Sequence, residues 1–334
     1  MTYKPWPATK NLCYHFQNRE RKLSFGDANP DKTFYVIRPI NDASPFYIGV
    51  RHHLLANYFY VISHLKYAHD MGWIPVIDQL NYPVFTSVCG EINGTRNAWE
   101  YFWQQPSSYT MDEVYSSKNV VLSKRSWFGQ WDIGYDIANY TNQDLIAFYN
   151  KIAAGVPIKD EIANHVSETA KELLPASKRV LGVSVRHAGH ARNSLFHAPG
   201  HPITPDTDAL LSIVEQKIIA WEMDYVFLAC DDECSYSAFV SAFGAQLLAL
   251  HKLRRDPTKQ YSVDNPPPMY AAHEMYNTAV NYLTEMTLLS MCTGIIGSPT
   301  SGVRYAVVHN HNAYENVEII DSGRFPNTMK LANR

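Results

Sequence analysis

Apolar runs and amphipathic stretches alternate along the first half of the chain. Residues 33–37 form an unbroken apolar strand-like run, and residues 54–69 carry apolar side chains at near-helical spacing. Gly72 ends that helix before a second apolar run over 73–77. Further helices are expected over 144–154 and 159–174. The pattern predicts layered α/β structure.

The second half repeats the order of strand followed by helix. Predicted strands cover 180–185, 225–228, 246–250 and 294–297. Predicted helices cover 206–221, 235–243, 274–291 and a last stretch that ends near residue 309. This order is typical of a doubly wound nucleotide-binding sheet, whose ligands bind beyond the carboxyl ends of the strands.

The length of 334 residues suits two domains of roughly 150 residues each. A polar break at Pro175-Ala176-Ser177-Lys178 marks the expected boundary. We therefore predict an N-terminal α/β domain over 1–177 and a C-terminal Rossmann-like domain over 178–334. Two such domains would enclose a cleft.

Composition excludes several classes of protein. Hydrophobic residues make up 46% and charged residues 18%, which is typical of a globular chain. The net charge of −3 offers no basic field for nucleic acid or anionic lipid, so phosphate recognition has to be local. No stretch approaches the roughly 20 apolar residues of a membrane span, and the N-terminus carries prolines and charge, so we expect a cytoplasmic protein without an integral membrane segment. Nothing in the composition indicates an oligomeric state.

Cysteine and aspartate spacing give little sign of a metal. The five cysteines are odd in number and scattered, which argues against a disulfide framework or a Cys-rich zinc site. None of Asp136, Asp224 and Asp256 has an aspartate two residues later, so we predict no Asp-x-Asp metal site. We expect no metal and no cofactor.

Arg186 follows the strand predicted over 180–185, so its guanidinium should emerge at the carboxyl edge of the sheet. A planar fork of donors suits a diphosphate and offsets the charge on a departing nucleotide. The alternative is an arginine held in a surface salt bridge.

The loop Ser298-Pro299-Thr300-Ser301-Gly302 joins the last predicted strand to a helix. Its hydroxyls and the first amides of the helix can close around phosphate oxygens, although no P-loop lysine follows. Ser298 could instead be only an N-cap with Pro299 at the first helical position. Together with Arg186, a shared phosphate site is the better interpretation.

Other polar residues also fall at expected strand ends and loops. Asp231 and Asp232 follow the strand over 225–228 and suit a metal, ribose hydroxyls, a base edge or merely a turn. We assign both to the nucleotide-sugar site. Gly49 lies in a turn that feeds a helix N-terminus, with His52 and His53 beside it, where an anion is favoured. Histidines that could accept a proton near neutral pH are His52, His53, His187, His190, His197 and His201.

These motifs, taken as a set, resemble a known family. Residues 183–187 with His197-Ala198-Pro199 look like the nucleotide-binding segment of the nodulation and core α1,6-fucosyltransferases. Residues 228–232 and 297–302 match further segments in the same order, and Gly49 with His52-His53 resembles the N-terminal loop. Residues 97–102 also look like bacterial glycosyltransferases encoded with surface-polysaccharide genes.

The resemblance implies a GT-B-like fold of two Rossmann-like domains that face each other across a cleft. It implies an inverting, metal-independent transfer of fucose or a related sugar from a GDP-sugar to a bacterial glycan. By match, Arg186 would hold the β-phosphate, and Ser298, Thr300 and Ser301 would flank the diphosphate. Gly49 would approach it from the other domain, and Asp264 would bind the guanine.

One departure bears on the catalytic base. The resembling families carry an acidic residue shortly after the arginine, whereas residues 186–205 contain no Asp or Glu. His190 is the best local replacement, followed by His187 and His197, or the departing phosphate takes the proton. The competing hypothesis is therefore a catalytically silent protein that binds a nucleotide or glycan. A P-loop phosphotransferase is disfavoured because no GxxxxGK[ST] string exists.

Tryptophans offer a last candidate surface. Trp99, Trp103, Trp127 and Trp131 could stack on sugar faces, although core packing is the better expectation for most of them.

Overall fold

The computed structural model describes residues 18–40, 54–125, 140–186, 200–256, 259 and 267–326. The chain divides into two compact units, Met1–Ile133 with Lys151–Lys159, and Gly134–Asn150 with Asp160–Arg334. Each unit contains its own sheet, so the α/β class predicted from the sequence is confirmed.

The first unit is built on a four-stranded sheet in the order β1-β4-β2-β3. Strands β2 and β3 run parallel, as do β2 and β4, whereas β1 is antiparallel to β4. The predicted strands β2 and β3 are confirmed to within a residue, while β1 and β4 are too short to leave a periodic pattern in the sequence. The bounds are β1 Arg21–Leu23, β2 Phe34–Ile37, β3 Ile74–Ile77 and β4 Val120–Leu122.

Helix α2 (Leu54–Asp70) contacts β2 and β3 and buries much of its length. Its Tyr58 stacks on Trp103, which in turn stacks on Trp99 with ring centroids 4.6 Å apart. Trp99 is fully buried and Trp103 is 2% exposed, so both belong to the core and not to a sugar-binding surface. Trp127 and Trp131 lie outside the described residues. Short helices complete the unit: η1 Phe85–Cys89, η2 Ala98–Tyr101 and α3 Met111–Val114.

The second unit is built on a five-stranded sheet in the order β7-β6-β5-β8-β9, and every neighbouring pair is parallel. The predicted bounds of β5 and β8 are confirmed. Strand β6 extends to Cys230, beyond its predicted end. Strand β9 was not predicted. The bounds are β5 Val180–Val185, β6 Tyr225–Cys230, β7 Leu247–Ala249, β8 Gly294–Gly297 and β9 Asn316–Ile319.

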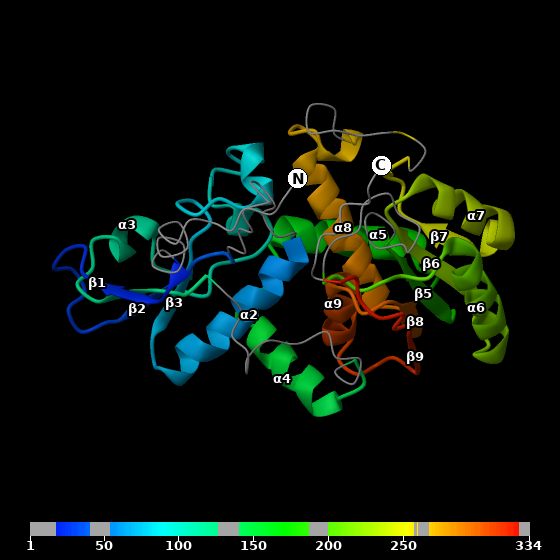
Figure 1. Cartoon of the computed structure of the whole chain (residues 1–334), viewed down its shortest axis with the longest axis horizontal. Helices are drawn as coiled ribbons and strands as arrows, with labels where there is room; N and C mark the ends of the chain where they lie inside the picture. Colours follow the sequence, from blue (N-terminus) through cyan, green and yellow to red (C-terminus); the bar gives the residue numbers. More distant parts are fainter. Residues whose placement is uncertain are drawn as a thin grey trace. The chain divides into compact units, whose positions relative to one another are not determined.

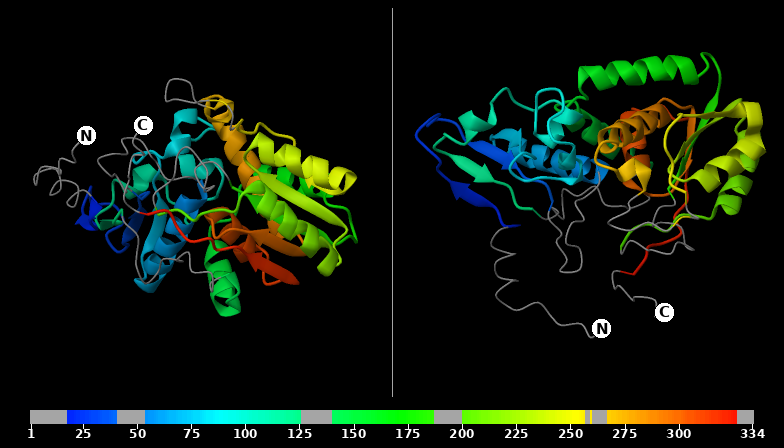
Figure 2. Two further views of the ribbon diagram at one scale, coloured as in Figure 1. Left: turned by 45° about the vertical axis from the view of Figure 1, so that its right-hand side comes forward. Right: turned by 90° about the horizontal axis from the view of Figure 1, so that it is seen from above.

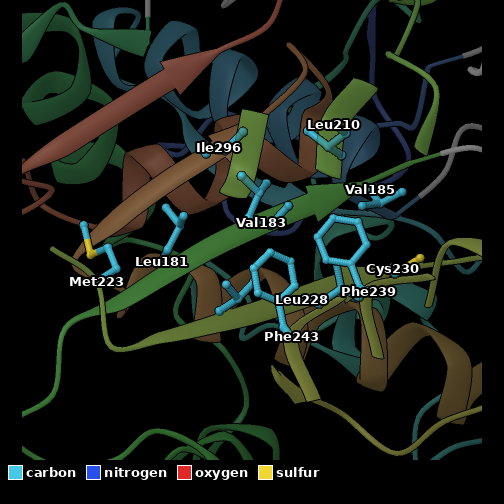
Figure 3. Packing of buried hydrophobic residues seen from close by; sticks show 12 residues of the cluster. Leu181, Val183, Val185, Leu210, Met223, Leu228, Cys230, Phe239, Phe243 and Ile296 are labelled. Carbon is cyan, nitrogen blue, oxygen red and sulfur yellow. The ribbon is translucent and has the colours of Figure 1, made fainter. Parts of the chain in front are cut away.

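Helices cover both faces of this sheet (Figure 1). On one face, Leu210 of α6 (Thr207–Ala220) and Phe239 of α7 (Glu233–Phe243) pack on the strands in one apolar cluster (Figure 3). On the other face lie α8 (Met275–Ser290) and α9 (Ser301–His309). The result is the doubly wound sandwich that the sequence pattern predicts for the second half.

Glycines let α8 and α9 approach the strands closely. A Cβ on Gly182 of β5 would lie 2.9 Å from Leu289 of α8, and one on Gly297 of β8 would lie 2.6 Å from Val303 of α9. A side chain at either position would force Leu289 or Val303 to move, so glycine permits this close approach.

Helix α5 (Asp160–Leu173) packs against α8 and belongs to the second unit, whereas the sequence analysis assigned it to the first domain (Figure 2). The polar break at 175–178 connects α5 to β5 inside this unit, so a break in composition did not mark a break in packing. The remaining elements are α4 Gln143–Ala153, η4 Gly244–Gln246 and η5 Pro268–Tyr270.

In the part of the chain that the structure describes, none of the helices combines the length and the apolar character that crossing a membrane requires. The described cysteines are free thiols, and Cys230 and Cys292 are buried.

Candidate functional site

The strand order of the second unit fixes where a ligand should bind. From β5 the chain continues to β6 and β7 on one side, and then returns to β8 and β9 on the other side. The neighbours β5 and β8 therefore form the topological switch point, which is where doubly wound sheets bind ligands at the carboxyl ends of their strands. Arg186 follows β5 and the loop 298–300 follows β8, so the switch point brings together the two predicted phosphate-binding elements.

Arg186 is held by an ion pair. The parallel register places Val185 of β5 opposite Cys230 of β6, so Arg186 and Asp231 follow as the next residues of adjacent strands. Nη1 of Arg186 donates to the carboxylate of Asp231. The Arg186 side chain is 22% exposed and that of Asp231 is 14% exposed. Asp231 thus orients the arginine, and its direct contact with the nucleotide stays a prediction.

Two tyrosines complete the surroundings of Arg186. Its guanidinium carbon lies 5.9 Å from the ring centroid of Tyr282, and Tyr270 forms a hydrogen bond with it. Burial disfavours the charge, but Asp231 and both tyrosines outweigh burial and raise the pKa of Arg186. The side chain is therefore a cation at any pH at which the protein is folded.

The loop after β8 caps the next helix. Oγ1 of Thr300 accepts a hydrogen bond from the backbone N–H of Val303, and α9 begins at Ser301. The alternative interpretation, in which Ser298 caps this helix and Pro299 takes the first helical position, is wrong by two residues, because Thr300 is the N-cap. Ser298 is 4% exposed, and its carbonyl accepts from the N–H of Thr300. The first amides of α9 thus sit at the switch point, where helix N-termini favour anions.

Asp232 has a structural partner. Its Oδ1 accepts from the backbone N–H of Ser235 at 2.8 Å, which makes Asp232 the N-cap of α7, and the residue is 3% exposed. This cap is why α7 begins at Glu233, ahead of the predicted start at Ser235. Asp232 therefore has a structural role as a helix cap, and its contact with the nucleotide stays a prediction.

An Asp-x-Asp run that the sequence analysis overlooked lies at the start of α6. Asp206 occupies the N-cap position and Asp208 the first turn, and both are exposed. Acidic residues are common there because they favour the helix dipole. Within the described part of the chain, no three His, Cys, Asp or Glu side chains gather as they would around a metal ion.

Glu285 of α8 is a buried acidic residue that sequence reasoning missed. It is 1% exposed, and its Oε2 accepts from Nζ of Lys252 at 2.6 Å. Among the described residues its Oε1 has no hydrogen-bond partner. Burial raises its pKa, against the effect of Lys252, and the charge of Asp231 raises it further. The available signal was a lone acidic residue within the apolar run 283–289.

Several predicted site residues fall outside the described part of the chain. They are Gly49, His52, His53, His187, His190, His197 and Asp264. His201 is described, and its carbonyl accepts from the N–H of Phe325.

Comparison with known proteins gives structural neighbours only. No protein-family model and no curated protein sequence matches the chain. It is similar to NodZ α-1,6-fucosyltransferase soaked with GDP-fucose, at 16% identity and a TM-score of 0.47 over 83% of this chain and 92% of that one. It is also similar to POFUT1 in complex with GDP, at 11% identity and a TM-score of 0.45 over 87% and 99%. A third neighbour is the fucosyltransferase NodZ from Bradyrhizobium, at 14% identity and a TM-score of 0.44 over 82% and 92%.

Proposed function

We propose that this chain is an inverting glycosyltransferase that transfers fucose or a related sugar from a GDP-sugar to a bacterial glycan without a metal ion. The observation that carries the proposal is the switch point of the second unit, where Arg186 after β5 and the capped N-terminus of α9 after β8 converge. A cation and a row of backbone amides are what a diphosphate requires.

Arg186 suits the departure of a nucleotide diphosphate. A guanidinium has five N–H donors, and here Asp231 and Tyr270 engage part of that set. The remaining donors can hold phosphate oxygens while the acceptor hydroxyl attacks the anomeric carbon. The bond from that carbon to the phosphate oxygen then breaks, and GDP leaves with the electron pair. Arg186 offsets the negative charge that develops on the leaving group.

Glu285 provides a reason for a guanine nucleotide. A buried carboxylate oxygen without a partner is costly, and a ligand that donates to it removes that cost. Guanine presents two adjacent N–H donor groups on one edge, whereas uracil flanks its single N–H with carbonyls that a carboxylate repels. Glu285 lies close enough to Asp231 for their charges to interact, which associates it with the same end of the sheet.

Calorimetric titration with GDP, UDP and CMP, each with and without a chelator, tests the proposal. We expect GDP to bind most tightly and the chelator to have no effect. Tighter UDP binding would contradict the assignment of the nucleotide. Loss of binding with chelator would contradict metal independence and direct attention to Asp206 and Asp208.

A matched variant sharpens the test of the nucleobase. Glu285→Gln keeps the size of the side chain but replaces a charged acceptor with an amide, so GDP and guanosine should both bind about tenfold more weakly. Pyrophosphate binding should be unchanged. A variant that binds guanosine as the native chain does would exclude Glu285 from base recognition.

The proton of the acceptor needs a base, and we propose His190 for this role on the sequence pattern alone. His190→Gln should lower transfer by roughly two to four orders of magnitude and leave GDP affinity nearly unchanged. Normal turnover with an unchanged pH profile would exclude His190.

The second candidate function is a catalytically silent nucleotide- or glycan-binding protein. It is favoured by the absence of Asp and Glu from residues 186–205. A native chain that binds GDP but neither hydrolyses nor transfers from any GDP-sugar would establish it. In either case we propose a GT-B-like arrangement, with the acceptor bound mainly by the first domain.

A further inference from the structure

The two halves of the proposed phosphate site are Arg186 after β5 and the loop 298–300 after β8. The backbone ladder between β5 and β8 does not extend to either of them. The ladder between β5 and β8 pairs Leu181 with Gly294 and ends where Val183 meets Ile296. Arg186 and Ser298 both lie beyond that last pair. A diphosphate that binds both elements at once needs them at a fixed separation, so side chains have to supply it.

One side chain of α8 contacts both halves. The ring centroid of Tyr282 lies 5.9 Å from the guanidinium carbon of Arg186. On the other side, a Cβ built on Gly302 in the first turn of α9 would lie 2.7 Å from Oη of Tyr282. Tyr282 therefore spans the switch point, from the cation after β5 to the helix after β8.

We propose that Tyr282 is a positioning residue, which sets the separation between the guanidinium of Arg186 and the first turn of α9. The inference rests on the proposed function, because it concerns the same phosphate site. The aromatic face attracts the guanidinium, and the rigid ring has few alternative rotamers once both ends are in contact.

Gly302 explains why the contact on the α9 side is tight. Its added Cβ would also lie 2.5 Å from Sδ of Met286, one turn further along α8. Real Cβ atoms do not approach other atoms so closely, so alanine at this position would force Tyr282 or Met286 to move. The methionine is flexible, but the tyrosine ring can only move by changing its contact with Arg186.

The test compares Tyr282→Phe and Tyr282→Leu with a matched control, Tyr225→Leu. Tyr225 begins β6 at the opposite, amino end of the same sheet. Phenylalanine keeps the aromatic face, whereas leucine keeps only apolar bulk. Affinities for GDP, pyrophosphate and guanosine are measured by calorimetry, and the unfolding temperature is measured for each variant.

We expect Tyr282→Leu to bind GDP and pyrophosphate about tenfold more weakly, as the loss of a partly desolvated cation–π contact implies. Guanosine binding should be unchanged, since it lacks the diphosphate. Tyr282→Phe keeps the ring on Arg186 but loses the hydroxyl that contacts α9, so its affinities should fall between those of Tyr282→Leu and those of the native chain. Tyr225→Leu should bind all three ligands as the native chain does. If Tyr282 had only a structural role, Tyr282→Leu would instead lower the unfolding temperature and weaken the binding of GDP and guanosine to the same extent.

Gly302→Ala provides a second variant if Tyr282→Leu does not fold. This variant keeps a tyrosine at position 282 but displaces its hydroxyl. The affinities for GDP and pyrophosphate should therefore fall again, and the affinity for guanosine should be unchanged. If the native chain binds GDP and none of these variants loses affinity selectively for GDP and pyrophosphate, the proposed role of Tyr282 is wrong. A native chain that binds neither GDP nor pyrophosphate would overturn the proposed function itself.

Discussion

Each unit has an arginine directly after a buried strand, and the two arginines differ in their hydrogen-bond partners and in their exposure. Arg38 follows β2 in the first unit, and Arg186 follows β5 in the second. Nε of Arg38 donates to the carbonyl of Ser123 at 2.8 Å, and its Nη2 donates to the carbonyl of Arg19 at 2.9 Å. Arg38 is 2% exposed, whereas the side chain of Arg186 is 22% exposed and pairs with a carboxylate.

The neighbouring strand makes the difference. Beside Arg38, the chain after β4 turns its Ser123 carbonyl toward the guanidinium, so the donors are used to join two backbone segments. Beside Arg186, the chain after β6 presents a side chain, Asp231, which orients the arginine through one nitrogen. A polar residue at a strand end is therefore a site candidate only when its hydrogen bonds leave donors available.

The largest effect should come from Arg38→Met. Two carbonyls that accept from a buried cation would lose their donor, which we expect to lower the free energy of unfolding by about 3 kcal/mol. Chemical denaturation followed by fluorescence measures this change. Arg186→Met should cost clearly less stability, because its pair with Asp231 is partly exposed. Equal losses in the two variants would remove the distinction between the arginines.

Arg186→Ala should lower GDP binding and sugar transfer more than it lowers stability, which is the opposite of the pattern expected for Arg38→Met. We expect GDP affinity and sugar transfer to fall by about 100-fold, since a partly buried charged contact to the diphosphate is lost. Arg186→Lys should restore little, because an ammonium cannot reproduce the planar fork. Calorimetry with GDP measures the affinity, and Arg38→Met at a temperature where it is folded provides the control. A folded, fully active Arg186→Ala protein would show that this arginine, like Arg38, is only structural.

Adjacent aspartates allow a finer comparison. Asp232→Ala removes the cap of α7 and should lower the free energy of unfolding by about 1 kcal/mol, with GDP affinity unchanged. Asp232→Asn keeps a capping oxygen and should match the native chain in both measurements. If Asp232→Asn instead weakened GDP binding, the predicted role of Asp232 in nucleotide binding would be supported.

The sequence predicted the sheet of the second unit better than its chemistry. Strands β5 and β8 are apolar runs bounded by polar breaks, so their ends, and hence Arg186 and the loop after Gly297, could be placed on one edge. Short strands such as β1 and β4 have too few residues to show a period of two. Thr300 and Ser298 are equally good caps by type, and only the backbone conformation distinguishes them.

Contacts across elements could not be predicted in the same way. Glu285 lies in a helical segment whose apolar pattern indicates core, and its partner Lys252 is distant in sequence. Likewise, the contact of Tyr282 with Gly302 depends on how closely α8 and α9 pack. Periodicity assigns residues to faces of elements, but it does not give the distance between two elements.

The smallest expected effect concerns one histidine in each unit, the buried His64 and the half-buried His309. Burial lowers the pKa of His64 in α2, and it lowers that of His309 in α9 to about 4, with His311 adding to the effect. His64 also forms a hydrogen bond of 2.7 Å with Oη of Tyr35, so its replacement would break a second interaction. The ring of His309 packs against that of Tyr305 in a tilted arrangement, with ring centroids 4.1 Å apart, and His309 is the cleaner position to test.

The direction of the pH effect follows from where the proton binds. Between the unfolded pKa of about 6.5 and the folded value of about 4, the unfolded chain binds more protons at this residue than the folded chain does. His309 therefore contributes stability above pH 6.5 that is lost as the pH falls toward 4. His309→Phe keeps an aromatic contact with Tyr305 and cannot be protonated. Between pH 7.5 and pH 5 this variant should therefore lose less stability than the native chain, by on the order of 1 kcal/mol. Denaturation at both pH values measures the difference, and parallel losses in the two proteins would show that His309 does not titrate as a buried base.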